Sequence, residues 1–360
     1  MHLLVNTGGG DAPGINAVIR AVTLSAVRRG FRVTGVRRGY AGLLESDPDG
    51  LIPLTRDLVR DITDRGGTLL GTVNRGQPFE YPVRDADGKE RIVDMSQRVL
   101  DRYRELGVDG LLAIGGDGSL RIAARFAEKG MNVIVVPKTI DNDLGSTEVT
   151  FGFDTAMSFA TEAVGRLRSS AEAHERVMVV EVMGRYAGWI ALYSGLAGSA
   201  HAVLLPEIDF DLDVLCSSIR HRFETNRPFA IVVVAEGAKP KGGERLVRVH
   251  EAGKEATLGG MGAYVAEEIQ RRTGYETRSL VLGHLQRGGS PTANDRVLAL
   301  RYGAAAVRLA AAGKWGQMVS YRPPTMSSVP LSTALAGSKS VPLDHDALQT
   351  ARDFGVCVGE

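Results

Sequence analysis

Short apolar runs alternate along the chain with stretches in which apolar residues recur at helical spacing. Apolar runs rich in β-branched residues predict strands over residues 2–6, 31–36, 110–114, 133–136, 177–182, 202–205 and 229–235. Apolar residues three and four positions apart predict helices over residues 13–29, 97–106 and 120–129. Strands that alternate with helices in this way indicate βαβ units and a mostly parallel sheet.

The pattern therefore predicts an α/β fold, and the chain is long enough for two domains. Residues 231–234 (IVVV) are apolar on both faces, which suits a parallel strand that helices cover on both sides. We expect a domain boundary near residues 138–152 and a return to the first domain near residue 287. The stretch from about Gly313 is rich in Pro, Ser and Ala, and we expect it to be an appended, peripheral segment.

Composition and charge narrow the classes of function. The 360 residues are 44% apolar and 24% charged, as in an ordinary globular protein, and the net charge of +1 gives no sign of a surface for nucleic acid. No run of about 18 apolar residues predicts a membrane span, and the N-terminus lacks a signal-peptide pattern. Cys216 and Cys357 fit neither a CxxC metal motif nor a disulfide framework, so a reducing cytosol is the expected compartment.

Three loops that suit phosphate binding follow directly after predicted strands. They are residues 7–14 (TGGGDAPG), 115–119 (GGDGS) and 137–143 (PKTIDND). Ligands of open parallel sheets bind where strands end, and glycines let backbone N–H groups approach phosphate oxygens. Taken singly, the first loop is better explained as a plain tight turn. In the second loop, a helix N-cap is the alternative role for Asp117, and Ser119 could serve as that cap too. Three such loops at successive strand ends favour phosphate binding.

The third loop carries two carboxylates, Asp141 and Asp143, with Thr139 beside them. A hydroxyl that attacks phosphorus needs a base, and an aspartate suits that role, although a solvated turn is the simpler alternative. Asp117, flanked by glycines at a strand end, is a candidate ligand for magnesium. The chain contains no GxxxxGK[ST] sequence and no HRD or DFG motif, which excludes P-loop kinases and protein kinases.

A second group of candidates consists of charged side chains next to glycines. Arg185, in the run EVMGR, is suited to stabilise the charge of a transferring phosphoryl group. Arg278, His284 and Arg287 lie in ETRSLVLGHLQRGG and suit a phosphate monoester, because guanidinium pairs with phosphate oxygens. Glu236 ends a predicted strand and can accept hydrogen bonds from sugar hydroxyls. For any single arginine, an ordinary surface charge is the alternative.

Together these motifs resemble the 6-phosphofructokinase family, including its clade of mixed ATP and pyrophosphate users. The matching segments run in family order from residue 3 to about residue 310, and they are TGGGDAPGINAVIRA, RRGYAGL, RGGTLLGT, AIGGDGSL, PKTIDND, FGFDTA, HERVMVVEVMGRYAGW and ETRSLVLGHLQRGGSP. The resemblance implies two three-layer α/β domains with mostly parallel sheets and an active site in the cleft between them. It assigns residues 1–152 with 287–340 to a donor domain, 153–286 to a sugar-phosphate domain and 341–360 to a C-terminal segment.

The same resemblance implies a glycolytic, cytoplasmic kinase that makes fructose 1,6-bisphosphate from fructose 6-phosphate with magnesium and ATP. Asp141 matches the catalytic base, and Arg185 matches the transition-state arginine. Sugar-phosphate contacts are implied for Thr139, Asp143, Arg176, Met183, Gly184, Arg185, Glu236, Arg278, His284 and Arg287. Donor contacts are implied for Gly10, Tyr40, Arg75, Asp117, Gly118 and Ser119, with magnesium near Asp117. Arg176 and Arg278 match arginines that act across a subunit interface, which implies a homodimer or homotetramer.

Two positions bear on the phosphoryl donor and disagree. Gly118 resembles ATP users, since an aspartate there would occupy the space of the nucleotide's α-phosphate and repel its charge. Lys138 resembles pyrophosphate users, in which an ammonium neutralises the departing phosphate. Excluded volume is the harder constraint, so we expect ATP as donor and keep pyrophosphate as the alternative.

Three departures from the family pattern stand out. Arg75 is offset from the arginine that usually follows GGTxLG. His201 stands where allosteric bacterial members carry a glutamate, which puts regulation by phosphoenolpyruvate or ADP in doubt. The C-terminal extension is longer than in the short bacterial members.

There are two rival classes of function. One is another kinase with a GGDG loop, such as an NAD or lipid kinase, and the other is a non-catalytic sugar-phosphate sensor. PKTIDND and LGHLQRGGSP disfavour the kinases, and the presence of Asp141 disfavours the sensor.

Overall fold

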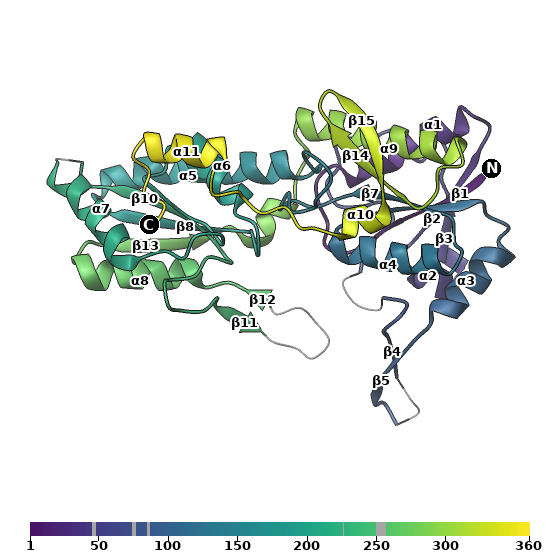
Figure 1. The fold of residues 1–360 in the computed structure, drawn as a ribbon, viewed down its shortest axis with the longest axis horizontal. Coiled ribbons are helices and arrows are strands. Elements are labelled where there is room, and N and C mark those ends of the chain that lie inside the picture. Colours follow the sequence, from purple (N-terminus) through teal and green to yellow (C-terminus); the bar gives the residue numbers. More distant parts are fainter. Residues whose placement is uncertain (45–47, 74–76, 85–86, 226, 250–256) are drawn as a thin grey trace. The chain divides into compact units, whose positions relative to one another are not determined.

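The computed structural model describes residues 1–44, 48–73, 77–84, 87–225, 227–249 and 257–360. The predicted donor contact Arg75 lies outside these residues. The chain forms two compact units (Figure 1). The first unit contains Met1–Ile140, Leu144–Asp154 and Arg287–Ser338, and the second contains Asp141–Asp143, Thr155–Gln286 and Lys339–Glu360. Each is an α/β unit, as the alternation of apolar patterns predicts.

The first unit is built on a seven-stranded sheet with the order β15-β14-β7-β6-β1-β2-β3. Its strands are β1 (His2–Thr7), β2 (Arg32–Val36), β3 (Leu51–Pro53), β6 (Gly110–Gly115), β7 (Val133–Pro137), β14 (Gln317–Arg322) and β15 (Thr325–Pro330). The five inner strands pair in parallel, whereas β3 and β15 join the two edges antiparallel. The carboxyl ends of the parallel strands therefore lie along one edge of the sheet.

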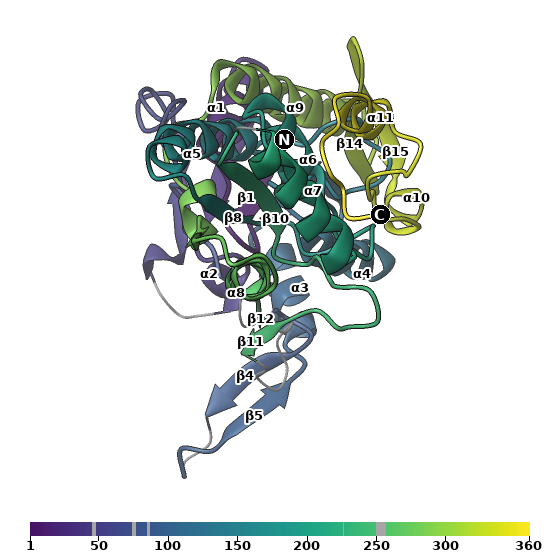
Figure 2. The same ribbon diagram turned by 90° about the vertical axis from the view of Figure 1, so that its left-hand side faces the viewer.

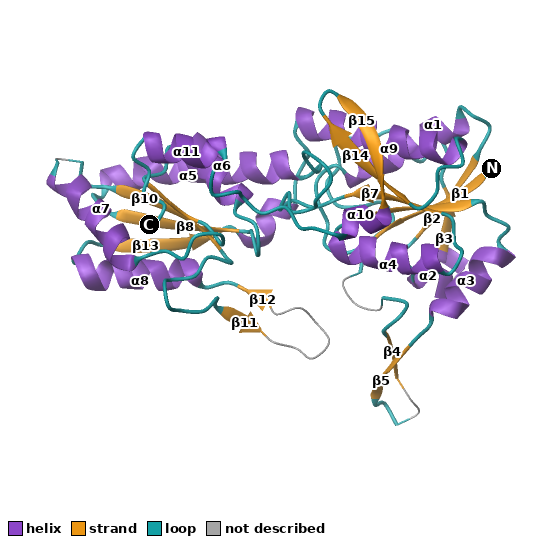
Figure 3. Cartoon of the chain, in the orientation of Figure 1, coloured by secondary structure: helices purple, strands orange, loops and turns teal. Residues whose placement is uncertain are grey.

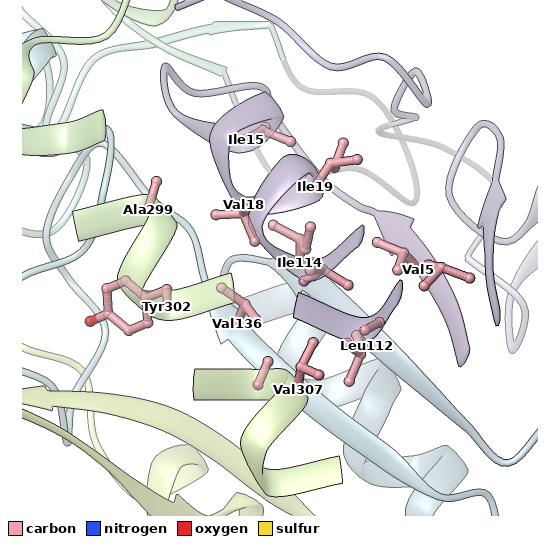
Figure 4. Close-up of a cluster of buried hydrophobic side chains, with 14 of the residues drawn as sticks. Val5, Ile15, Val18, Ile19, Leu112, Ile114, Val136, Ala299, Tyr302 and Val307 are labelled. Atoms are coloured by element: carbon pink, nitrogen blue, oxygen red, sulfur yellow. The ribbon is translucent and has the colours of Figure 1, made fainter. Parts of the chain in front are cut away.

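Helices cover both faces of this sheet (Figure 3). On one face, α1 (Ile15–Val27) packs against α9 (Ala293–Ala311). The other face carries α2 (Ala41–Leu44), α3 (Ser96–Glu105), α4 (Asp117–Glu128) and α10 (Leu331–Leu335). Because successive strand residues point to opposite faces, Leu3 and Val5 join the core beneath α1 and α9 while Leu4 joins the other core. Figure 4 shows the first of these cores, where Val5 lies near Ile19.

The second unit has a four-stranded, wholly parallel sheet with the order β13-β8-β10-β9. Its strands are β8 (Val177–Val182), β9 (Ala202–Leu204), β10 (Ala230–Ala235) and β13 (Thr277–Val281). Figures 1 and 2 show α5 (Phe153–Ala173), α6 (Trp189–Ala197) and α11 (Asp346–Asp353) on one side of the sheet and α8 (Met261–Thr273) on the other, with α7 (Leu212–Glu224) packed against α8. The strands β8 and β10 are buried along their whole length, as continuous apolar runs predict.

Among the described residues, the remaining elements are two antiparallel strand pairs and two short 3₁₀ turns. The strand pairs are β4 (Tyr81–Arg84) with β5 (Glu90–Val93) and β11 (Val247–Val249) with β12 (Thr257–Leu258). The turns are η1 (Pro48–Gly50) and η2 (Gly283–Arg287), and the second of these carries predicted site residues. In the part of the chain that the structure describes, no helix has both the length and the apolar character needed to cross a membrane.

The expectation of a patternless, peripheral segment from Gly313 was wrong. Residues 317–330 form β14 and β15, and β14 pairs in parallel with β7. Further on, Cys357 pairs with Ala202 beside β9, within the second unit. Both strands contain serine, and half of the residues of β15 are exposed at the sheet edge, so the sequence shows no apolar run there. Edge strands need only part of their side chains to be apolar, which hides them from hydrophobic periodicity.

Candidate active site

The three predicted loops meet at one edge of the first unit's sheet. The strands β1, β6 and β7 are parallel neighbours, and their registers pair Thr7 with Ile114 and Gly115 with Pro137. Each loop leaves the sheet at the next residue or two. The strand pattern of the sequence predicted this arrangement, since carboxyl ends of parallel strands lie at the same edge.

Glycine backbone forms the contact between the first two loops. The Gly8 N–H donates to the Ile114 carbonyl at 2.9 Å. A Cβ at Gly8 would lie 2.6 Å from the Ser119 hydroxyl oxygen, and one at Gly115 would lie 2.2 Å from it. No residue larger than glycine fits either position without displacing Ser119, since real Cβ atoms do not approach that closely. The Thr72 hydroxyl donates to the Gly9 carbonyl at 2.6 Å and holds the first loop from its other side.

Two cations lie against the Gly10 end of the first loop. The buried ammonium of Lys138 donates to the Gly10 carbonyl, while the Lys138 backbone N–H donates to the Gly115 carbonyl at 2.9 Å. The Arg287 guanidinium donates to the Asp11 carbonyl at 3.2 Å and packs over Gly10. The structure thus places Arg287, a predicted sugar-phosphate contact, beside the donor loop within the first unit.

The GGDG loop leads into α4, and its last two residues, Asp117 and Gly118, are exposed, whereas Gly115 is buried. Gly116 is the N-cap, so the reading of Asp117 as the N-cap is wrong, and Asp117 is instead the first residue of the helix. Its carboxylate accepts from the Arg121 guanidinium at 2.9 Å, with both side chains more than half exposed. A Cβ at Gly118 would meet no heavy atom of the described residues within 4 Å. The position next to Asp117 therefore has room for a ligand or for a larger side chain.

Magnesium is compatible with this loop only as an ion shared with phosphate. In the described part of the chain, no cluster of three or more His, Cys, Asp or Glu side chains could form a metal site made by protein alone. Magnesium is commonly held by one or two carboxylates together with substrate phosphates and water. The exposed carboxylate of Asp117 beside two glycines fits that mode of binding.

The PKTIDND loop connects the two units. Residues up to Ile140 belong to the first unit, and Asp141–Asp143 belong to the second. The Thr150 hydroxyl fixes the Thr139 carbonyl at 2.8 Å. At the other end of the loop, the Asp143 carbonyl accepts from the Lys339 N–H at 2.8 Å. Between these anchors Asn142 adopts a left-handed conformation with φ 51°, which asparagine tolerates better than most residues. The half-buried Asp141 therefore sits in a turn that is fixed on both sides.

In the second unit, the predicted acceptor residues lie at the carboxyl ends of neighbouring strands. Met183, Gly184 and Arg185 follow β8, and Glu236 follows β10. The Glu236 N–H donates to the Val182 carbonyl at 2.9 Å, and the Gly237 N–H donates to the Gly184 carbonyl at 3.2 Å. A Cβ at Gly237 would lie 1.9 Å from the Arg185 carbonyl oxygen, so only glycine fits there. His284 lies on η2, just beyond β13, and is exposed.

Two side chains that the sequence analysis did not single out, the buried Gln286 and the half-buried Glu207, hold this loop. Gln286, 1% exposed, accepts from the Met183 N–H at 3.3 Å through Oε1. Glu207 accepts from the Gly188 N–H at 2.9 Å and from the Val341 N–H at 2.8 Å, both through Oε1. Burial raises the pKa of the Glu207 carboxyl. Gln286 lies inside the LGHLQRGG motif, which was a usable signal, whereas Glu207 follows a predicted strand with no distinguishing motif.

Arg176 and Arg278 lie at the opposite end of this sheet. Arg176 directly precedes β8, and Arg278 pairs in register with Met178 near the start of β13. Both contact Glu276, with N···O distances of 3.5 Å from Arg176 and 2.9 Å from Arg278. A six-residue strand spans about 20 Å at roughly 3.3 Å per residue. The structure therefore does not bring these two arginines together with Arg185.

Tyr40 and His201 are both held by contacts with other parts of the protein. Tyr40, a predicted donor contact, is 7% exposed and packs against Phe126 with ring centroids 5.2 Å apart, and burial raises the pKa of its hydroxyl. His201 accepts from the Ile231 N–H at 2.9 Å through Nδ1. Burial, and then the positive charges of Arg222 and Arg168, lower the pKa of His201 to about 3, so its ring is neutral.

Comparison with known proteins shows which family this chain resembles. A model of the phosphofructokinase family matches residues 2–310. The chain is 44% identical over 355 residues to the ATP-dependent 6-phosphofructokinase 1 of Synechocystis sp., covering 98% of this chain and 97% of that protein. It is 49% identical over 349 residues to the pyrophosphate–fructose 6-phosphate 1-phosphotransferase of Amycolatopsis mediterranei, covering 96% of this chain and 97% of that protein.

Solved structures show the same fold. The phosphofructokinase of Saccharomyces cerevisiae matches with a TM-score of 0.80 and 27% identity over 93% of this chain, which spans 45% of that longer chain. The pyrophosphate-dependent phosphofructokinase of Nitrosospira multiformis matches with a TM-score of 0.81 over 100% of this chain and 92% of that one, at 21% identity. The second likeness is one of fold alone.

Proposed function

This chain belongs to the phosphofructokinase family, and we propose that it transfers the terminal phosphoryl group of ATP to the 1-hydroxyl of fructose 6-phosphate. The observation that carries the proposal is the PKTIDND loop. It starts among the glycine loops of the first unit, where Lys138 contacts Gly10, and it continues into the aspartates that group with the second unit. A donor grip and a candidate base thus lie on one short segment, as phosphoryl transfer requires.

In the proposed reaction, the 1-hydroxyl oxygen attacks the terminal phosphorus of ATP. The bond from that phosphorus to the bridging oxygen breaks, ADP leaves, and the hydroxyl proton passes to the Asp141 carboxylate. Arg185 stabilises the negative charge on the transferring group, which is worth most when the guanidinium is held in place beforehand. The hydrogen bond from the Gly237 N–H to the Gly184 carbonyl holds the backbone directly before Arg185 in this way. The products are fructose 1,6-bisphosphate and ADP.

We divide the remaining predicted residues between contacts to the acceptor, fructose 6-phosphate, and contacts to the phosphoryl donor. We assign sugar-phosphate contacts to Thr139, Asp143, Met183, Gly184, Glu236 and His284, and donor contacts to Gly10, Asp117, Gly118 and Ser119. Arg287, which packs over Gly10, is assigned to the sugar 6-phosphate by resemblance and to the donor loop by its contacts. Magnesium would be held by Asp117 with the donor phosphates, and it would neutralise their charge.

ATP is favoured over pyrophosphate by the space at Gly118. The room around that position can accept the additional phosphate of a nucleotide, whereas an aspartate there would fill it. Lys138, whose ammonium lies on the donor loop, is the observation that supports pyrophosphate as the second candidate. The first relatives matched are named ATP-dependent 6-phosphofructokinases, and relatives named for pyrophosphate also appear, so the comparisons do not favour the alternative.

We also propose that a second copy of the chain completes the acceptor site. Arg176 precedes β8, and Arg278 lies near the start of β13. Arg185 and His284 follow the carboxyl ends of the same two strands. If all four side chains bind the same substrate class, the arginines at the amino ends of the strands must bind a substrate molecule held by a different copy of the chain. Symmetric homo-oligomers form such shared sites readily, because a two-fold axis repeats the contribution in both directions. The free thiols of Cys216 and Cys357 suit the reducing cytoplasm in which we place this glycolytic step.

A steady-state assay with fructose 6-phosphate and each donor in turn tests the proposal. Purified protein with magnesium and ATP should form ADP and fructose 1,6-bisphosphate, and pyrophosphate should support little turnover. Robust turnover with pyrophosphate and none with ATP would reverse the donor assignment. No turnover of fructose 6-phosphate with either donor would refute the proposed function.

A further inference from the structure

Residues 339–341, here called the strap, contact both loops to which the proposed function assigns chemistry. The Lys339 N–H donates to the Asp143 carbonyl at 2.8 Å, two residues from Asp141. The Lys339 carbonyl accepts from the Trp189 indole Nε1 at 3.0 Å, four residues from Arg185. One residue of the strap thus binds the end of the base loop with its N–H and the end of the arginine loop with its carbonyl.

Glu207 fastens the strap to the arginine loop a second time. Its Oε1 accepts from Gly188, where that loop enters α6, and from Val341 of the strap. The fit is close, because a Cβ at Gly188 would lie 2.8 Å from the other carboxylate oxygen of Glu207. Val341 is 2% exposed, so its N–H has little access to water as an alternative partner. Glu207 is half-buried, and removing a carboxylate that bridges two backbone donors leaves both donors without their partner.

The chain beyond the strap is anchored as well. The His345 ring packs edge-on against Trp189, with centroids 5.0 Å apart. Near the C-terminus, the Cys357 N–H donates to the His201 carbonyl at 3.0 Å, and the Val203 N–H donates to the Cys357 carbonyl at 2.8 Å. The chain from the strap to Cys357 is therefore held by the base loop at one end and by β9 at the other, so the strap is not part of a loose tail.

We propose that the strap and Glu207 are positioning elements for phosphoryl transfer, which keep the loop of Asp141 and the loop of Arg185 in one fixed geometry. The inference rests on the roles that the proposed function gives to Asp141 and Arg185. Reaction rates depend steeply on such geometry, since a displacement of about 1 Å can cost on the order of a hundredfold in rate.

Lys339→Pro and Lys339→Ala separate the backbone contact from the side chain. Proline removes the N–H that binds Asp143, whereas alanine keeps it and removes only the side chain, whose ammonium lies 5.1 Å from the Trp189 ring centroid. We expect Lys339→Pro to lower kcat about tenfold, with KM for ATP within twofold of wild type. Lys339→Ala should stay within about threefold of wild type in both constants. Equal kcat for the two variants would overturn the proposal.

A second, independent pair of variants is Glu207→Leu and Glu207→Gln. For this pair, tryptophan fluorescence reports on the surroundings of the strap. Glutamine keeps an Oε1 acceptor, and leucine has none. In a Trp315→Phe background, Trp189 is the remaining tryptophan, and it is 3% exposed beneath the strap. Glu207→Leu should shift its emission to the red and lower kcat about tenfold, while Glu207→Gln should do neither. A red shift with unchanged kcat, or a lowered kcat without the shift, would overturn the proposal.

Two further measurements distinguish a folding defect from a loss of the positioning role, and failure of the positioning role from failure of the proposed function. Far-UV circular dichroism identifies a variant that fails to fold, in which case the other pair decides. Wild type and Asp141→Asn are assayed alongside. An inactive wild type refutes the proposed function itself, whereas an active wild type, an impaired Asp141→Asn and an unimpaired Lys339→Pro refute only the positioning role.

Discussion

The two groups of site loops are held in place in different ways. In the first unit, the donor loops are short glycine-rich segments that follow adjacent strands, and they contact one another through backbone atoms. In the second unit, the loops that carry Asp143 and Arg185 are held by residues distant in sequence, namely Glu207, Gln286 and Lys339. The order of the strands therefore brings the donor loops together, and Thr72, Lys138 and Arg287 add contacts to the first of them. On the acceptor side, side chains and backbone from distant segments fix the loops. Substitutions on the two sides should accordingly have separable kinetic effects.

The largest expected effect is on the donor side, at Gly118. Gly118→Asp should abolish use of ATP, because the new carboxylate occupies the space and opposes the charge of the nucleotide phosphates. The fold should be retained, since the site around Gly118 is open. Gly118→Ala is the matched control, and it should keep kcat/KM for ATP within a few fold. Unchanged ATP kinetics in Gly118→Asp would refute the steric argument.

The next largest effect concerns the arginines at the far end of the second sheet. Arg278→Ala should raise KM for fructose 6-phosphate about tenfold or more, because a charge-assisted hydrogen bond is worth about 1.5–3 kcal/mol. KM for ATP should not change. Arg166, an exposed arginine of α5 that pairs with Glu162, supplies the control variant Arg166→Ala, with no change expected in either constant.

Mixed oligomers test whether Arg278 acts across an interface. Arg278→Ala subunits that are refolded together with Asp141→Asn subunits should regain activity at low fructose 6-phosphate, because some sites then combine an intact Asp141 with an intact Arg278 from the other copy. If the mixture shows only the sum of the separate activities, each chain uses its own Arg278, and the shared site is excluded.

The smallest expected effect is on stability and involves His201. Its folded-state pKa of about 3 lies below the ordinary value of 6.5, so between these pH values the unfolded chain binds a proton that the folded chain does not. Stability should therefore fall as the pH drops from about 6.5 towards 3. In His201→Asn, whose amide oxygen can still accept from Ile231, the decrease in Tm between pH 7 and pH 5 should be smaller than in wild type. An equal decrease in Tm would show that His201 contributes nothing to the acid sensitivity.

The sequence predicted those features that depend on neighbours in the chain. The strands and helices around the donor loops lie within a few residues of their expected positions, and the loops meet where parallel strands require. The sequence missed β14, because an inner strand of six residues that ends in Ser-Tyr-Arg lacks a strong apolar pattern. It also missed Glu207 and Lys339, because their partners Gly188 and Asp143 are distant in the sequence. Arg287 lies with the donor loop through its contact with Asp11, which no local pattern indicates.

Turnover by Asp141→Asn tests the central claim most directly. Asparagine keeps the size of the side chain but cannot take the proton of the 1-hydroxyl, so kcat should fall roughly a hundredfold or more. Binding of fructose 6-phosphate, measured separately by equilibrium titration, should be mostly retained, because the substitution leaves the other acceptor residues in place. Wild-type kcat in Asp141→Asn would contradict the assignment of Asp141 as the base and, with it, the mechanism proposed for this chain.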